Sequence, residues 1–184
     1  MKKVLTILSI ALLASTSTYA QKYFSRAGHV NFFSDTKMED IKADNNKATV
    51  IVDAATGAVE LSLLVKSFEF EKALMQEHFN ENYMESDTYP KASFKGKIDN
   101  IAAVNFKKDG TYNSTVTGEL TMHGVTKKIT INVTIKVTGG KISATSKFQV
   151  VPEDYNIKIP NTVRDNIAAK IDVSVDATLE ELKK

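Results

Sequence analysis

The 184-residue sequence has the composition of an ordinary globular domain: 42% of the residues are hydrophobic, 25% are charged, and glycine and proline number only 8 and 3. It contains no cysteine, which excludes disulfide bonds, cysteine nucleophiles and thiolate metal sites. Its 24 basic and 22 acidic residues nearly balance and form no basic patch interleaved with aromatic residues, so nucleic acid is not an expected partner.

Residues 1–20 have the pattern of a secretory signal peptide. Lys2 and Lys3 precede an apolar run over residues 4–14, and a short polar segment ends at Ala20 with small residues where a signal peptidase cleaves. The apolar run is shorter than the roughly 20 residues that a helix needs to cross a bilayer. We therefore predict cleavage after Ala20, export, and one mature domain over residues 21–184 that does not span a membrane.

The first half of the mature chain alternates weakly between apolar and polar residues. This alternation predicts strands over residues 30–34, 47–53, 59–66 and 92–98. Between residues 71 and 84, Met75, Phe79 and Tyr83 recur every four residues, with polar residues on the opposite side. This spacing predicts a short amphipathic helix, and Pro90 ends helical geometry before the next strand.

The second half alternates more strictly. It predicts strands over residues 112–122, 129–137, 141–150 and 170–179. Turn sequences separate these runs at Asp109-Gly110, His123-Gly124 and Gly139-Gly140. Because one face of each strand is apolar and the other polar, we expect an antiparallel sheet with one face in water.

About eight such strands can pair all their edges by closing into a barrel. We therefore predict an all-β fold with a short helix, in which an antiparallel eight-stranded β-barrel forms the single domain. The helix is expected to cover or line one end of the barrel, with docking on the outer wall as the alternative. An eight-stranded interior is either filled by side chains or just wide enough for one small ligand, and the sequence leaves both open.

The sequence shows no catalytic or metal-binding constellation. His29, His78 and His123 match no metal-binding spacing, and no nucleophile elbow, phosphate-binding loop or dinucleotide motif occurs. The carboxylates form no pair expected to converge on one cavity, and the compact group at residues 153–155 is expected to be structural. We predict no catalytic residues, no metal and no cofactor, and an apolar interior favours binding.

Two stretches of the chain match a known pattern. The first contains His78-Phe79, Tyr83-Met84 and the run YPKASF at residues 89–94, and the second is GELTMHGVT at residues 118–126. Together they resemble the paired signatures of the YceI-like polyisoprenoid-binding family over roughly residues 22–182. The resemblance implies a lipocalin-like barrel that encloses a long isoprenoid chain, such as that of a quinone or another prenyl lipid. Members are commonly exported bacterial proteins, here expected in the periplasm, that can form homodimers.

One position departs from the family pattern. Many members carry an arginine shortly before an aspartate and an aromatic residue, whereas this chain has Glu153 before Asp154-Tyr155. The polar contact of that arginine is therefore not expected here, and the head group of the ligand is left open.

The resemblance and the strand alternation together select the residues expected to line a lipid-binding cavity. They are Val30, Phe32, Leu61, Leu63, Met75, Phe79, Tyr83, Phe94, Val116, Gly118, Leu120, Met122, Ile131, Val133, Phe148 and Val173. The prediction is an exported, non-enzymatic protein that carries or stores an isoprenoid or similar long-chain lipid. The alternative is a packed barrel that serves as an interaction or structural module of the cell envelope and holds no ligand.

Overall fold

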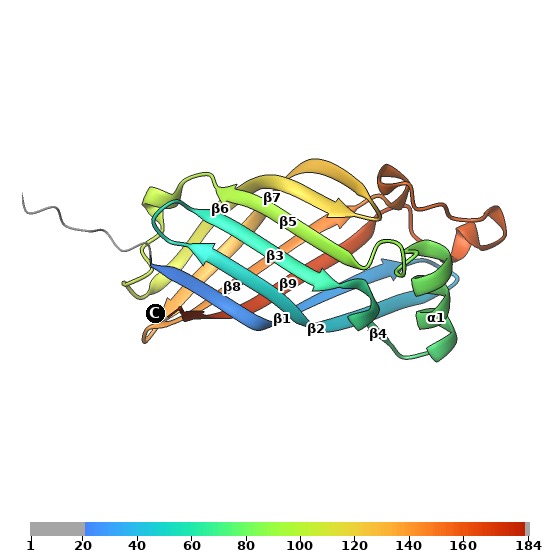
Figure 1. Cartoon of the computed structure of the whole chain (residues 1–184), viewed down its shortest axis with the longest axis horizontal. Coiled ribbons are helices and arrows are strands. Elements are labelled where there is room, and N and C mark those ends of the chain that lie inside the picture. Colours follow the sequence, from blue (N-terminus) through green and yellow to red (C-terminus); the bar gives the residue numbers. More distant parts are fainter. Residues whose placement is uncertain (1–20, 183–184) are drawn as a thin grey trace, which may run out of the picture.

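The computed structural model describes residues 21–182, so the predicted signal peptide over residues 1–20 lies outside the described residues. Within this range the chain forms an elongated β-barrel with a short helix at one end (Figure 1). The barrel strands are β1 (Lys22–Asp35), β2 (Asp40–Asp53), β3 (Ala58–Leu64), β5 (Lys91–Ile98), β6 (Gly110–Met122), β7 (Val125–Thr138), β8 (Lys141–Val150) and β9 (Ile171–Glu181). The predicted all-β fold with a short helix is confirmed.

The strands pair in antiparallel fashion all the way around the barrel. Their order is β1-β9-β8-β7-β6-β5-β3-β2, and β1 pairs with β2 to complete the circle. A two-residue strand, β4 (Glu69–Phe70), adds to β2 at Ala43 and Asp44. Closure pairs both edges of the sheet, as the alternation of the sequence predicted.

β1 and β2 are each 14 residues long and exceed the segments predicted for them. Their pairing shifts register between Ser25 and Gly28 and again between Gly28 and Val30. Such bulges place an extra residue on one strand and interrupt the alternation of its faces. The interruption hid the first part of β1 from the sequence pattern, so that His29, expected before a strand, lies within one.

Short helical segments occupy the connections between strands. They are η1 (Val65–Ser67), α1 (Ala73–His78), η2 (Phe79–Tyr83), η3 (Ile101–Ala103), η4 (Pro152–Tyr155) and η5 (Asn161–Asn166). The helix predicted over residues 71–84 is present as α1 and continues as a π-helical segment, η2. The four 3₁₀ segments were not predicted.

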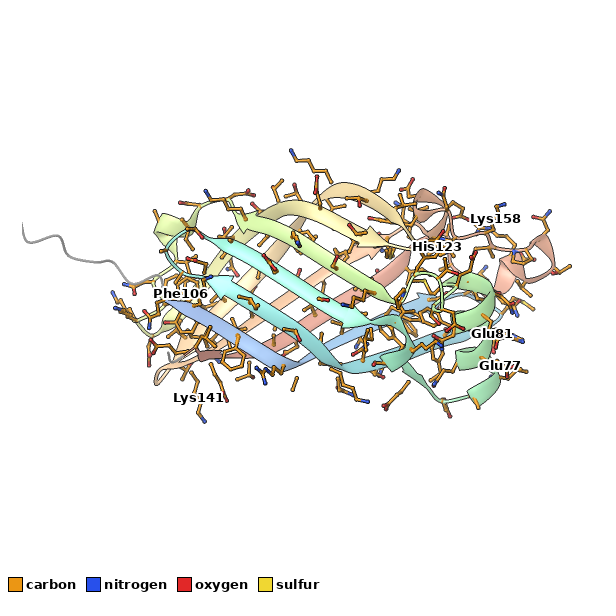
Figure 2. The ribbon with its side chains drawn as sticks, in the orientation of Figure 1. Glu77, Glu81, Phe106, His123, Lys141 and Lys158 are labelled. Atoms are coloured by element: carbon orange, nitrogen blue, oxygen red, sulfur yellow. The ribbon has the colours of Figure 1, made fainter. Side chains whose placement is uncertain are left out.

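The two ends of the barrel differ. The β1–β2 turn, α1, η2 and η5 gather at one end, which we call the helix end (Figure 1). The β7–β8 turn lies at the opposite end, which we call the closed end. Figure 2 labels Phe106 and Lys141 at the closed end, and Glu77, Glu81 and His123 toward the helix end.

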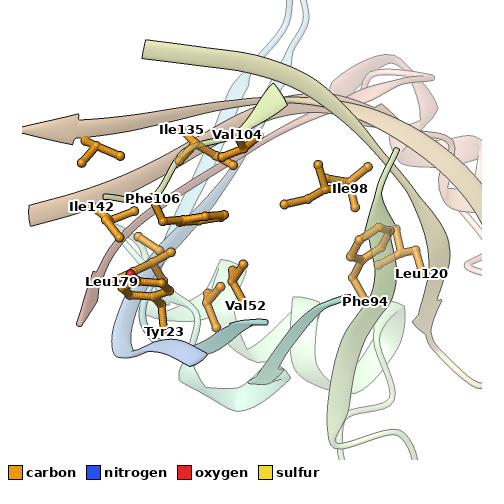
Figure 3. Close-up of a cluster of buried hydrophobic side chains, with 14 of the residues drawn as sticks. Tyr23, Val52, Phe94, Ile98, Val104, Phe106, Leu120, Ile135, Ile142 and Leu179 are labelled. Atoms are coloured by element: carbon orange, nitrogen blue, oxygen red, sulfur yellow. The ribbon is translucent and has the colours of Figure 1, made fainter. Parts of the chain in front are cut away.

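Packed side chains fill the barrel at the closed end. The ring of Tyr23 stacks on that of Phe106 with centroids 5.3 Å apart, and Ile142 and Leu179 are buried in the same cluster (Figure 3). Burial, followed by the negative charge of Glu181, raises the pKa of the Tyr23 hydroxyl. The interior at this end is therefore a hydrophobic core.

At the helix end of the barrel, β7 and β8 do not pair with each other. Pairing of these two strands stops at Asn132 and Lys147, whereas β8 pairs with β9 as far as Val150. η4 follows β8 and packs against β7, where the Lys127 ammonium lies 3.6 Å from the Asp154 carboxylate. η4 thus covers the seam that the two strands leave.

Candidate functional site

An apolar cavity of about 390 Å³ occupies the barrel interior and extends to the helix end. The burial of inward-facing side chains along β8 marks where it begins. Ile142 is 1% exposed, whereas Ala144, Phe148 and Val150 are only half-buried. Because these half-buried residues contribute to the cavity wall, the interior changes from a packed core at the closed end to a cavity toward the helix end.

The residues predicted to line a cavity come together around this one. Every predicted residue except Gly118 contributes to the wall. They come from every barrel strand except β2, and from α1 and η2. Strand alternation thus assigned the inward face correctly even for β1, whose full length it did not predict.

Gly118 faces the interior but lies beneath another side chain. It pairs with Gly96 of β5, and the ring of Phe94 lies against both glycines. A Cβ atom on Gly118 would overlap the backbone oxygen of Lys95 and lie 2.7 Å from the Phe94 ring. The prediction that Gly118 lines the cavity is therefore wrong, because the β5 backbone and the Phe94 ring fill the space that the missing side chain leaves.

α1 and η2 cover the helix end of the cavity. Met75, Phe79 and Tyr83, the apolar stripe of the predicted helix, are half-buried and contribute to the wall. His78 also contributes to the wall although it is exposed, so the cavity reaches the surface beside it. Leu74, one turn away from His78, is 61% exposed and lies outside the wall.

Four phenylalanine rings hold this helix on the barrel. The ring centroid of Phe79 lies 5.3 Å from that of Phe32 on β1 and 5.1 Å from that of Phe70 on β4. Phe68 packs edge-on against Phe79 at 5.7 Å. Sequence reasoning missed Phe68 and Phe70 as wall residues, although their alternation around Glu69 is a strand signal.

Residues 156–170 cross the helix end between η4 and β9, and we call them the strap. Val163 and Ile167 of the strap contribute apolar surface to the cavity wall. The backbone N–H of Ala168 donates a hydrogen bond to Ser34 Oγ at 2.9 Å. Arg164 forms an ion pair with Glu153 at 2.5 Å, so the residue that departs from the family pattern fastens the strap to η4.

Glu39 joins three elements at the helix end. It lies in the β1–β2 turn, and its carboxylate accepts hydrogen bonds from Lys72 Nζ at 3.1 Å and from Asn166 Nδ2 at 3.4 Å. Lys72 directly precedes α1, and Asn166 ends η5 in the strap. Glu39 also contributes to the cavity wall. We call the place where the cavity reaches the surface, between this turn, α1 and the strap, the mouth.

His123 has a structural role at the β6–β7 turn. Its φ of 49° is left-handed, and its ring is 8% exposed. Because a carbonyl oxygen only accepts, His123 Nδ1 donates to the Tyr155 carbonyl oxygen, 3.0 Å away. The Tyr89 ring meets the imidazole edge-on at 4.7 Å. These contacts fix the turn to η4, beside the seam between β7 and β8.

The cavity wall offers little reactive chemistry. Glu39, His78 and Tyr83 are its titratable residues within residues 21–182, and the wall there includes no lysine or arginine. In the same part of the chain no three histidine, aspartate or glutamate side chains come together in a way that could hold a metal ion. Such a site can enclose an apolar molecule and contact a polar group at the mouth.

No helix among the described residues is long and apolar enough to cross a membrane.

The fold is similar to those of solved bacterial proteins. A polyisoprenoid-binding domain from Saccharophagus degradans, implicated in plant cell wall breakdown, superposes with a TM-score of 0.76 and 16% identity, covering 89% of this chain and 100% of that one. Burkholderia cenocepacia BcnA gives a TM-score of 0.68 and 18% identity, covering 83% and 96%. A Campylobacter jejuni YCEI protein gives 0.51 and 17%, covering 100% and 92%.

Sequence comparison gives the family. The chain has no significant match among curated proteins. The model of the YceI-like domain family matches residues 16–179, which is most of the chain. The match includes both stretches, at residues 78–94 and 118–126, on which the resemblance was based. The chain therefore belongs to the YceI-like domain family.

Proposed function

We propose that this protein is an exported, non-enzymatic carrier or storage protein that holds an isoprenoid or similar long-chain lipid in its barrel. The observation that supports the proposal best is the continuous apolar cavity of about 390 Å³ between the packed core and the mouth. The similar Saccharophagus degradans domain is described as polyisoprenoid-binding. The predicted signal peptide over residues 1–20 supports export to the periplasm.

The energetics of the cavity favour a ligand with a long apolar chain. Burial of each methylene group contributes about 0.8 kcal/mol before the costs of ordering the ligand. Because the wall is apolar over most of its length, this term alone supplies affinity. The volume also lies within the range of roughly 300–1,000 Å³ typical of small-molecule sites.

The same cavity disfavours a packed structural module. In engineered cavities the loss of stability grows by roughly 24 cal/mol for each Å³ left empty. A barrel with no ligand would therefore bear a cost that larger side chains at small positions such as Ala144 and Ser146 would remove. A lipid that fills the space explains why these small residues stand in the wall.

Val133→Phe tests the proposal. Val133 of β7 is half-buried in the cavity wall and pairs with Ser114 and Ser146, so a phenyl ring there has small neighbours and extends into the cavity. We expect the variant to fold and its Kd for geranylgeraniol to rise at least about tenfold, which corresponds to about 1.4 kcal/mol.

Asn132→Phe is the matched control. Asn132 is the preceding residue on β7, and its exposed side chain points to the opposite face of the strand. We expect this variant to bind geranylgeraniol as the wild type does. Folded Val133→Phe protein with undiminished binding would contradict the proposal.

A further inference from the structure

The polar groups of the cavity wall are distributed unevenly. Toward the closed end the wall consists of apolar side chains such as Val52, Ile98 and Leu179, which are almost fully buried. At the mouth the wall includes the carboxylate of Glu39, the imidazole of His78 and the amide of Asn166. The other polar residues of the wall contribute hydroxyl groups only, and they are Ser34, Tyr83, Ser93, Thr145 and Ser146. A ligand with an apolar chain and a polar head would therefore have its chain directed to the closed end and its head at the mouth.

Glu39 is the one carboxylate in this wall within residues 21–182. Its two oxygens face Lys72 and Asn166, but a carboxylate has about four lone-pair positions, so each oxygen can accept another hydrogen bond. The 3.4 Å distance to Asn166 is at the long limit of a hydrogen bond, which leaves that oxygen weakly engaged. Glu39 thus presents an acceptor with negative charge at the mouth.

The nearest cation at the mouth is already paired. Lys72 Nζ lies 3.1 Å from Glu39, and the lysine side chain is 64% exposed. The wall itself contains no lysine or arginine in the described part of the chain. A phosphate head would carry about 1.5 to 2 negative charges at neutral pH and would meet the Glu39 carboxylate at a place where the described part of the cavity wall supplies no lysine or arginine.

We propose that Glu39 selects the head group of the ligand. The site takes long-chain lipids with an uncharged head that donates a hydrogen bond, such as a hydroxyl or an amide, and rejects lipids with a phosphate head. This inference rests on the proposed function, since it assigns the head group of a ligand whose chain occupies the barrel.

The experiment compares two lipids that share one chain and differ in the head, geranylgeraniol and geranylgeranyl phosphate. Equilibrium binding of each labelled lipid to the mature protein gives the ratio of the two Kd values. We expect the wild type to bind the alcohol at least about tenfold more tightly, a difference of about 1.4 kcal/mol. Equal or tighter binding of the phosphate would overturn the inference without any variant.

Glu39→Gln gives the second arm of the test. Glutamine keeps the size and the acceptor oxygen of the side chain, but it removes the negative charge and leaves Lys72 unpaired. We expect the variant to bind geranylgeranyl phosphate about tenfold more tightly than the wild type does, which corresponds to about 1.4 kcal/mol of binding free energy. Its affinity for geranylgeraniol should fall by a smaller factor, so the ratio of the two Kd values changes. An unchanged ratio would overturn the role of Glu39.

Glu77→Gln is the matched control, because Glu77 is exposed on α1 and does not contribute to the cavity wall. Its removal changes the net charge at the helix end by the same amount and should leave the ratio unchanged. A shift as large as that of Glu39→Gln would assign selectivity to the general charge of this end and overturn the inference. Uptake of neither lipid by the wild type would refute the proposed function, and the inference with it.

Discussion

Phe94 fills the space above two glycines that face each other across β5 and β6. A Cβ atom on Gly118 would lie 2.5 Å from the Cα of Gly96, closer than nonbonded carbon atoms approach. The absence of a side chain on Gly96 and on Gly118 lets the Phe94 ring lie close to the backbone of both strands. At this point the interior is packed, although the cavity begins nearby.

We predict that Gly118→Ala destabilises the ligand-free protein by about 1–3 kcal/mol, as overpacking of a filled core does. Urea unfolding of the purified variant measures this loss. Ala144→Val, which adds volume on the cavity side of β8, should change the stability less. A Gly118→Ala variant as stable as the wild type would show that the β5 backbone and the Phe94 ring do not crowd this position.

Asp53 stabilises the β2–β3 turn through its charge. Its Oδ1 accepts hydrogen bonds from the backbone N–H groups of Ala55 at 2.9 Å and Thr56 at 3.0 Å. The hydrogen bond from Thr56 is the largest influence, and together these contacts hold the pKa of Asp53 below its ordinary value. The charged form is therefore favoured in the folded state.

A lowered pKa in the folded state gives stability at pH values above the unfolded pKa, about 3.9 for aspartate, and this stability is lost as the pH falls through the folded pKa. We predict that Asp53→Asn is less stable than the wild type at pH 7 and that the difference shrinks toward pH 2.5. Urea titrations at several pH values test this. A difference that does not depend on pH would show that the charge contributes nothing.

At the scale of elements, the helix depends on one aromatic residue. Phe79 contacts Phe32, Phe68 and Phe70 and is half-buried at the helix end. Replacing a fully buried phenylalanine by alanine lowers the free energy of unfolding by about 3–5 kcal/mol, and by less where the ring is only partly buried. We predict a loss of about 2–3 kcal/mol for Phe79→Ala.

Urea unfolding of ligand-free protein measures this loss, and Leu74→Ala is its control. Leu74 is 61% exposed on the same helix, so its replacement should change the stability by less than about 0.5 kcal/mol. Equal effects of the two substitutions would show that Phe79 does not anchor the helix.

The sequence predicted some elements more fully than others, for physical reasons. β8 has the predicted bounds, because its apolar and polar residues alternate without interruption. The bulges around Gly28 broke the alternation of β1, and the strap has neither a helical nor a strand period. An element with no regular repeat has no periodic pattern in the sequence. A contact between distant residues, such as that of Glu39 with Lys72, has none either.

For the whole molecule, the alternation of apolar and polar residues could not predict that the interior is divided into a packed core and a cavity. The inward residues of β8 follow the same pattern at both ends, yet Ile142 lies in the packed core and Phe148 in the cavity wall. The difference depends on what crosses the barrel, such as the stacked rings of Tyr23 and Phe106 at the closed end. Such contacts join residues from distant parts of the chain, and the sequence pattern of a single strand does not contain them.

The packed core and the cavity have separate roles in the proposed function. The closed end stabilises the barrel through burial, while the helix end leaves apolar surface free for a ligand that enters at the mouth. The protein would therefore remain folded without its lipid and gain stability when the lipid binds.

Native mass spectrometry of the protein purified from its own cell envelope tests whether the barrel holds a lipid. We predict a mature chain that begins at Gln21 and has one noncovalently bound lipid, released on activation and identified by its own mass. Protein that lost its lipid during purification should take up one molecule of geranylgeraniol per chain. A ligand-free mass under gentle conditions, together with no uptake of prenyl lipids, would contradict the claim that the barrel holds a lipid.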